Sequence, residues 1–77
     1  MIDPPKVRQV LEEMGWRFIK EDYGLYLFDH PSDSNVTNPL VLDLSMDKCT
    51  EESIRNPLEK NGVDWSIFTQ LLDAIDG

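Results

Sequence analysis

The first hydrophobic pattern in the chain has the period of an α-helix. Four apolar residues recur at the spacing of one helical face: Val7, Val10, Leu11 and Met14. Asp3 followed by Pro4 is typical of a helix start, because an acidic cap precedes a residue whose missing N–H costs nothing in the first turn. Gly15 stands where a left-handed residue commonly ends a helix. The pattern therefore predicts a helix between Asp3 and Gly15.

Three segments then have the composition of β-strands, and they are 16–20, 25–28 and 40–44. The second is apolar at every position, which is typical of a central strand with both faces covered. In the third, Leu40, Leu42 and Leu44 fall on one face. We expect the first turn at Glu21-Asp22, with Gly24 nearby. Segment 30–39 is dense in turn-forming residues and predicts a loop, so the strands should form an antiparallel meander.

The last third of the chain is helical again, with one obstacle. Thr50 supplies a capping hydroxyl before two acidic residues, which favours a helix start. Pro57 lies inside the expected helix, where a proline removes a hydrogen bond and clashes with the preceding turn. The helix should therefore either kink at Pro57 or restart with Asn56 as its cap. Asn61-Gly62 should end it.

A final helix capped by Asp64 should direct five residues inward: Trp65, Phe68, Leu71, Leu72 and Ile75. The predicted fold class is α+β, in the order α-β-β-β-α-α. We expect one small domain over residues 1–77, with a three-stranded antiparallel sheet and the helices packed on one of its faces.

The net charge of the chain disfavours some classes of function. Fifteen acidic residues against seven basic ones give the 77-residue chain a net charge of −8. Because Lys and Arg contacts to phosphate supply most nucleic-acid affinity, a general nucleic-acid binder is disfavoured. The acidic surface favours solubility, with a basic protein partner as the alternative. Neither a signal peptide nor a membrane span is evident, so we expect a cytoplasmic protein. Cys49 has no partner for a disulfide and is expected to be a semi-buried small hydrophobic residue.

Three stretches carry a resemblance to a known family. They are Leu11 to Trp16, Leu27 to Pro31, and Glu52 to Arg55 continuing through Leu58 to Val63. In their order and spacing the chain resembles the HicA-type mRNA interferase toxins, over roughly residues 7–75. The resemblance implies a fold like that of double-stranded-RNA-binding domains. It also implies that the family's catalytic histidine, within a Gly-Ser/Thr-His element, would fall on Leu25. Leucine cannot transfer a proton, so an active ribonuclease is not expected.

The other candidate sites are weaker than their structural alternatives. His30, the single histidine, could act in catalysis, but His-Pro is also a natural exit from a strand. Asp29, His30 and Asp33 have ligand chemistry for a metal, although carboxylates near a turn are usually solvated. The stretch that begins at Asp43 starts like a calcium loop, then has Lys48 and Ile54 where glycine and glutamate are required, so we reject it.

Tyr23 and Tyr26 could stack on bases at an open sheet face, although packing or protein binding suits the charge better. We predict no catalytic, cofactor-binding or metal-binding residues and no cofactor. The leading hypothesis is a non-enzymatic, acidic interaction or regulatory module that binds a protein. The alternatives are a divergent RNA-binding or RNA-cleaving toxin and an acidic mimic of nucleic acid. Pairing of an edge strand leaves a homodimer open.

Overall fold

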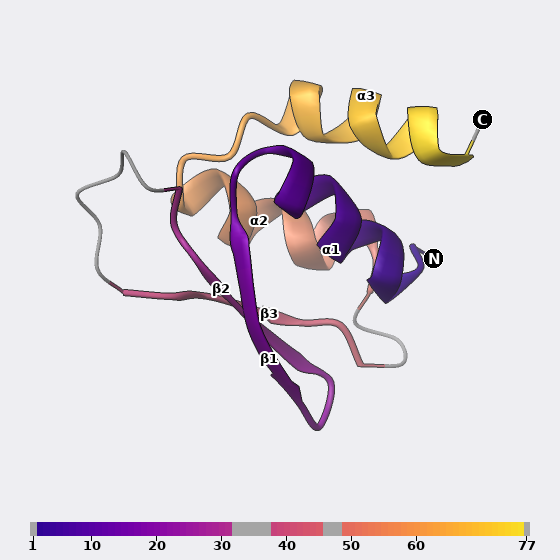
Figure 1. Cartoon of the computed structure of the whole chain (residues 1–77). Helices are drawn as coiled ribbons and strands as arrows, with labels where there is room; N and C mark the ends of the chain where they lie inside the picture. Colours follow the sequence, from indigo (N-terminus) through magenta and orange to yellow (C-terminus); the bar gives the residue numbers. More distant parts are fainter. Residues whose placement is uncertain (1, 32–37, 46–48, 77) are drawn as a thin grey trace.

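The computed structural model describes residues 2–31, 38–45 and 49–76, and shows an α+β fold in the predicted order (Figure 1). The elements are α1 (Pro4–Glu13), β1 (Arg17–Asp22), β2 (Leu25–Asp29), β3 (Leu40–Asp43), α2 (Glu51–Lys60) and α3 (Trp65–Asp76). Part of the expected loop at 30–39 and the centre of the rejected calcium loop lie outside the described residues. The fold class and the element order are confirmed.

The sheet is the expected antiparallel meander in the order β1-β2-β3, with β2 in the centre. Phe28 is paired with Phe18 on one side and Leu40 on the other. Between Phe18 and Lys20 the register shifts by one residue, so Ile19 forms a bulge in β1. A bulge increases local twist and makes an edge strand a poorer template for further pairing.

All three helices lie on one side of the sheet and leave the other side uncovered (Figure 1). The hydrophobic core between helices and sheet consists of Val7, Val10, Leu11, Trp16, Phe28, Leu40, Leu42, Leu44, Cys49, Ile54, Leu58, Val63, Phe68 and Leu72. The predicted inward faces of α1, β3 and α3 are represented in this cluster, and Met14, Trp65, Leu71 and Ile75 pack against it. The periodicity therefore identified the buried faces of α1, β3 and α3. The expectation that both faces of β2 are covered is wrong, because the helices lie on one side only and Leu25 is 40% exposed.

Two of the three predicted helix caps make the expected side-chain hydrogen bond, and the third does not. Thr50 caps α2 by accepting a hydrogen bond from the Ser53 N–H at 3.2 Å. Asp64 accepts from the Ser66 N–H at 2.9 Å and so caps α3. Asp3 occupies the N-cap position of α1 but makes no side-chain capping bond. The helix start is as predicted, but the capping bond is absent because Pro4 and Pro5 have no N–H and the Lys6 N–H donates to the Asp3 backbone carbonyl at 3.0 Å. One Asp3 carboxylate oxygen lies 3.7 Å from the Lys6 ammonium.

The first turn and the path of α2 also differ from expectation. β1 continues through Asp22, so the turn is the two-residue Tyr23-Gly24 rather than Glu21-Asp22. α2 runs unbroken from Glu51 to Lys60 with Pro57 inside it, so the expected alternative of a restart at Asn56 is wrong. Pro57 has no N–H to donate to the Ser53 carbonyl, the partner four residues earlier in a regular helix. Ser53 is exposed, so water can donate the missing hydrogen bond to this carbonyl.

Candidate interaction surface

The uncovered face of the sheet carries an apolar centre between charged ends. Phe28 is buried beneath the helices, and Leu25 and Leu27 alternate with it along β2, so these leucines face the other way. Cross-strand pairing sets three rows on this side: Asp22–Leu25–Asp43, Lys20–Leu27–Val41 and Arg17–Asp29. We call these eight residues the open face.

The apolar centre of the open face is accessible to solvent. The side of the sheet beneath the helices is buried at Leu40 and Leu42, whereas Leu25 is 40% exposed and Val41 is 47% exposed. Leu27 lies between them and is half-buried. Contiguous apolar side chains with a polar rim are typical of a surface that another molecule covers. The open face is therefore the candidate interaction surface.

The two ends of the open face differ in charge. At one end the Arg17 guanidinium donates a hydrogen bond to the Asp29 carboxylate at 2.8 Å, so the two charges offset each other. At the other end two carboxylates, Asp22 and Asp43, stand on either side of Leu25 in one row. Asp43 accepts hydrogen bonds from the Ser45 N–H at 3.1 Å and the Ser45 hydroxyl at 2.6 Å. The row through Leu25 is thus the acidic end of the face.

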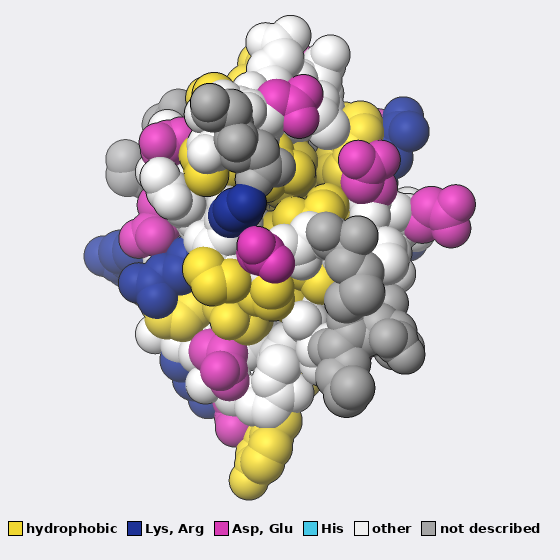
Figure 2. All heavy atoms as spheres, turned by 90° about the vertical axis from the view of Figure 1, so that its right-hand side faces the viewer, with side chains coloured by type: hydrophobic (Ala, Val, Ile, Leu, Met, Phe, Trp, Pro, Cys, Tyr) yellow, Lys and Arg dark blue, Asp and Glu magenta, His cyan; other side chains and the backbone are white. Residues whose placement is uncertain are grey.

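The open face carries two basic side chains, Arg17 and, in its middle row, Lys20. Most basic side chains of the described residues are engaged with acids. Within the described parts of the chain, three arginines each pair with a carboxylate, namely Arg8 with Glu12, Arg17 with Asp29 and Arg55 with Glu59. On the side of the molecule seen in Figure 2, the positive side chains lie mainly along one edge and acidic ones are spread among apolar and uncharged atoms. No broad basic patch spans that side.

Of the residues considered for chemistry, Asp29 and His30 lie in the described part of the chain and make separate contacts. His30 packs against Trp16, with ring centroids 4.4 Å apart, and its Nε2 is buried without a hydrogen-bond partner. Asp29 is paired with Arg17, and Asp33 lies outside the described residues. Among residues 2–31, 38–45 and 49–76, no group of three or more His, Cys, Asp or Glu side chains is placed to hold a metal ion.

The two tyrosines occupy different surroundings. Tyr26 has the same orientation as Phe28, toward the helices, and its ring lies 5.8 Å from that of Phe18. Packing, the alternative that the sequence favoured over base stacking, is therefore confirmed for Tyr26, because the alternation along β2 turns it inward. Tyr23 is 94% exposed in the β1–β2 turn.

Cys49 is buried more completely than expected, at 1% exposure. Burial raises the pKa of its thiol, and the neighbouring Asp3 carboxylate raises it further. Both effects disfavour the thiolate, which is the reactive form. Cys49 therefore packs as a small hydrophobic residue in the core.

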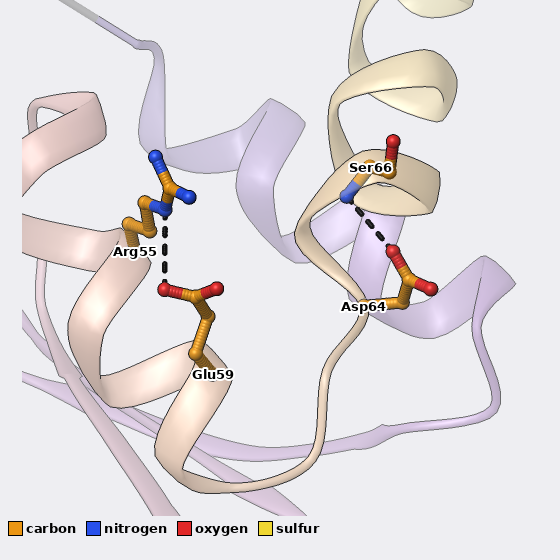
Figure 3. A network of polar contacts seen from close by, with 4 residues as sticks. All are labelled: Arg55, Glu59, Asp64 and Ser66. Carbon is orange, nitrogen blue, oxygen red and sulfur yellow. Dashed lines mark hydrogen bonds and ion pairs between the residues drawn. The ribbon is translucent and has the colours of Figure 1, made fainter.

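A cleft of about 620 Å³ between α2 and α3 was not anticipated. Figure 3 shows its polar contacts: Arg55 to Glu59 at 3.1 Å, and the Ser66 N–H to Asp64 at 2.9 Å. The Arg55 guanidinium also lies 5.7 Å from the ring of Trp65. Its charged groups already have partners, Arg55 with Glu59 and Asp64 with the backbone N–H groups of α3, so we interpret the cleft as a junction between helices. The i,i+4 spacing of Arg55 and Glu59 was the available signal.

Comparison of the chain with protein-family models, with curated proteins and with solved structures gives no match. Within the described residues, every helix is too short or too polar to cross a membrane. The open face is therefore interpreted from its own chemistry.

Proposed function

We propose that this protein is a non-enzymatic binding module that docks a partner protein on its open face. The observation that carries the proposal is the exposed apolar centre, with Leu25 between Asp22 and Asp43. Leu25 is also the position at which the resemblance to HicA-type toxins would place a catalytic histidine. A leucine there removes proton transfer and adds apolar contact area, which favours binding over catalysis.

The charge of the face defines the partner. Apolar side chains of the partner cover Leu25, Leu27 and Val41, and its Lys or Arg side chains meet the acidic row. Complementary charge of this kind raises association rates and excludes acidic competitors. The carboxylates of Asp22 and Asp43 would repel phosphate, and the single cation of the neighbouring row, Lys20, does not outweigh them, so a protein fits better than RNA. A regulatory role in a toxin–antitoxin or stress system is what the family resemblance adds to this proposal.

The test uses two variants with matched exposure. Val41 on the open face and Ile67 on α3 are each 47% exposed, so Val41→Asp and Ile67→Asp add the same charge at equally accessible sites. The full chain is used to recover binding proteins, which are identified, purified and titrated against each variant. We expect Val41→Asp to raise the Kd by roughly tenfold or more, since it places a charge at the centre of an interface. Equal effects of Val41→Asp and Ile67→Asp would refute a role for the open face.

A further inference from the structure

The turn between β1 and β2 contains a residue that the local backbone disfavours. Asp22 pairs with Leu25, so Tyr23 and Gly24 alone form the turn. Their φ angles are +51° and +82°, the left-handed values that a two-residue hairpin turn of this kind requires at both positions. Asn, Asp and Gly accept such angles readily, whereas an aromatic residue does so at a cost. Tyr23 is the non-glycine residue with positive φ in the described chain.

The fold gains no contact in return for Tyr23. Its side chain is 94% exposed and makes no hydrogen bond or ring contact with the residues that the structure describes. Tyr26, three positions later, packs against Phe18 and the core. A disfavoured backbone angle combined with an unused aromatic ring indicates a role outside folding.

The turn is held firmly enough to present this ring in a fixed place. The Gly24 carbonyl accepts a hydrogen bond from the Leu44 N–H at 2.8 Å. Gly24 also lies so close to Ser45 that a Cβ on Gly24 would stand 2.5 Å from the Ser45 Cβ. Asp43 in turn holds Ser45 through two hydrogen bonds. Preorganisation of this kind lowers the entropy that a binding residue loses when it is fixed by a partner.

The surroundings of Tyr23 are acidic and unobstructed. The two preceding residues are both exposed, with Asp22 on the open face and Glu21, which pairs with Tyr26, on the opposite side of the hairpin. Asp43 lies in the same row of the open face as Asp22. Figure 1 shows the β1–β2 turn projecting away from the helices, at the lower end of the molecule. A partner seated on the open face can therefore reach the turn without meeting a helix.

We propose that Tyr23 is an anchor for the partner protein, and that its ring enters an apolar pocket whose rim carries Lys or Arg facing Glu21 and Asp22. This inference rests on the proposed function and adds the chemistry of the partner's pocket to it. Tyrosine is enriched among the residues that dominate interface energies, because it buries a large rigid ring and keeps a polar end. Base stacking by Tyr23 is disfavoured, since the two acids repel the phosphates that accompany a base.

The first measurement concerns the free protein. Tyr23→Asn places a residue that suits the left-handed turn at the same position. We expect the urea midpoint of this variant to equal or exceed that of the wild type. A lower midpoint would overturn the inference, because Tyr23 would then be serving the fold.

The second measurement is the Kd of the purified partner protein, identified as described above, for Tyr23→Asn, Tyr23→Phe and Glu21→Lys. We expect Tyr23→Asn to raise the Kd by roughly tenfold or more and Tyr23→Phe by far less, because the ring supplies the buried area. Glu21→Lys should weaken binding most at low salt, where the charges are least screened.

The outcomes separate this inference from the proposed function. If Val41→Asp abolishes binding while Tyr23→Asn binds like the wild type, the open face stands and the anchor is wrong. If no protein is recovered, both proposals fail. Both also fail if the wild type binds a synthetic RNA and the Tyr23→Asn variant does not.

Discussion

At the scale of single residues, alanine substitutions at two glycines distinguish the free-energy cost of a left-handed backbone angle from the cost of a steric clash. Gly24 and Gly62 have nearly the same φ, +82° and +84°, but a Cβ on Gly24 would clash with Ser45 and one on Gly62 would meet nothing within 4 Å. We expect Gly62→Ala to lower the free energy of unfolding by about 1 kcal/mol and Gly24→Ala by about 2–4 kcal/mol. Urea denaturation of both variants measures the difference. Equal losses would mean that the turn is not held against Ser45.

At the scale of secondary-structure elements, Pro57 tests how far packing overrides propensity. It lies inside α2, where its missing N–H and its ring disrupt the helical ladder, yet α2 is continuous. We expect Pro57→Ala to raise the free energy of unfolding by about 1–2 kcal/mol, less than the full helical penalty because proline also restricts the unfolded chain. Asn56→Ala, at the exposed neighbouring position, is the control and should change little. Destabilisation by Pro57→Ala would show that the half-buried proline ring contributes essential packing.

The elements also show what a sequence can predict. Apolar spacing identified the inward faces of α1 and α3, and short-range side-chain chemistry identified the caps at Thr50 and Asp64. These features depend on neighbours within four positions. The position of the first turn was missed, because tyrosine gives no sign that it will adopt a positive φ. For α2 the sequence left a kinked helix and a restart at Asn56 open, and local patterns could not decide between them, since the deciding factor is the tertiary packing of Ile54 and Leu58.

The open face required information that no local pattern contains. The family resemblance drew attention to Leu25, but its neighbours are set by strand pairing. Asp22 and Asp43 are three and eighteen positions away in the chain, and only the register brings them to either side of Leu25. The bulge at Ile19 shifts that register by one residue on β1. Without the bulge, alternation along β1 would turn Asp22 toward the helices instead.

At the scale of the whole molecule, charge predicts that a histidine placed at position 25 will not create an RNA-cleaving site. With a net charge of −8 and two carboxylates beside position 25, Leu25→His places an imidazole where phosphate is repelled. We expect this variant to cleave a fluorescent RNA no faster than the wild type. Its RNA affinity should show almost no dependence on salt, because no counterions are released without phosphate contacts. The matched variant carries Asp22→Lys and Asp43→Lys in addition, and should gain binding with a slope of about −1 to −2 for log K against log salt. Cleavage by Leu25→His alone would show that the open face accepts RNA despite its acidic row.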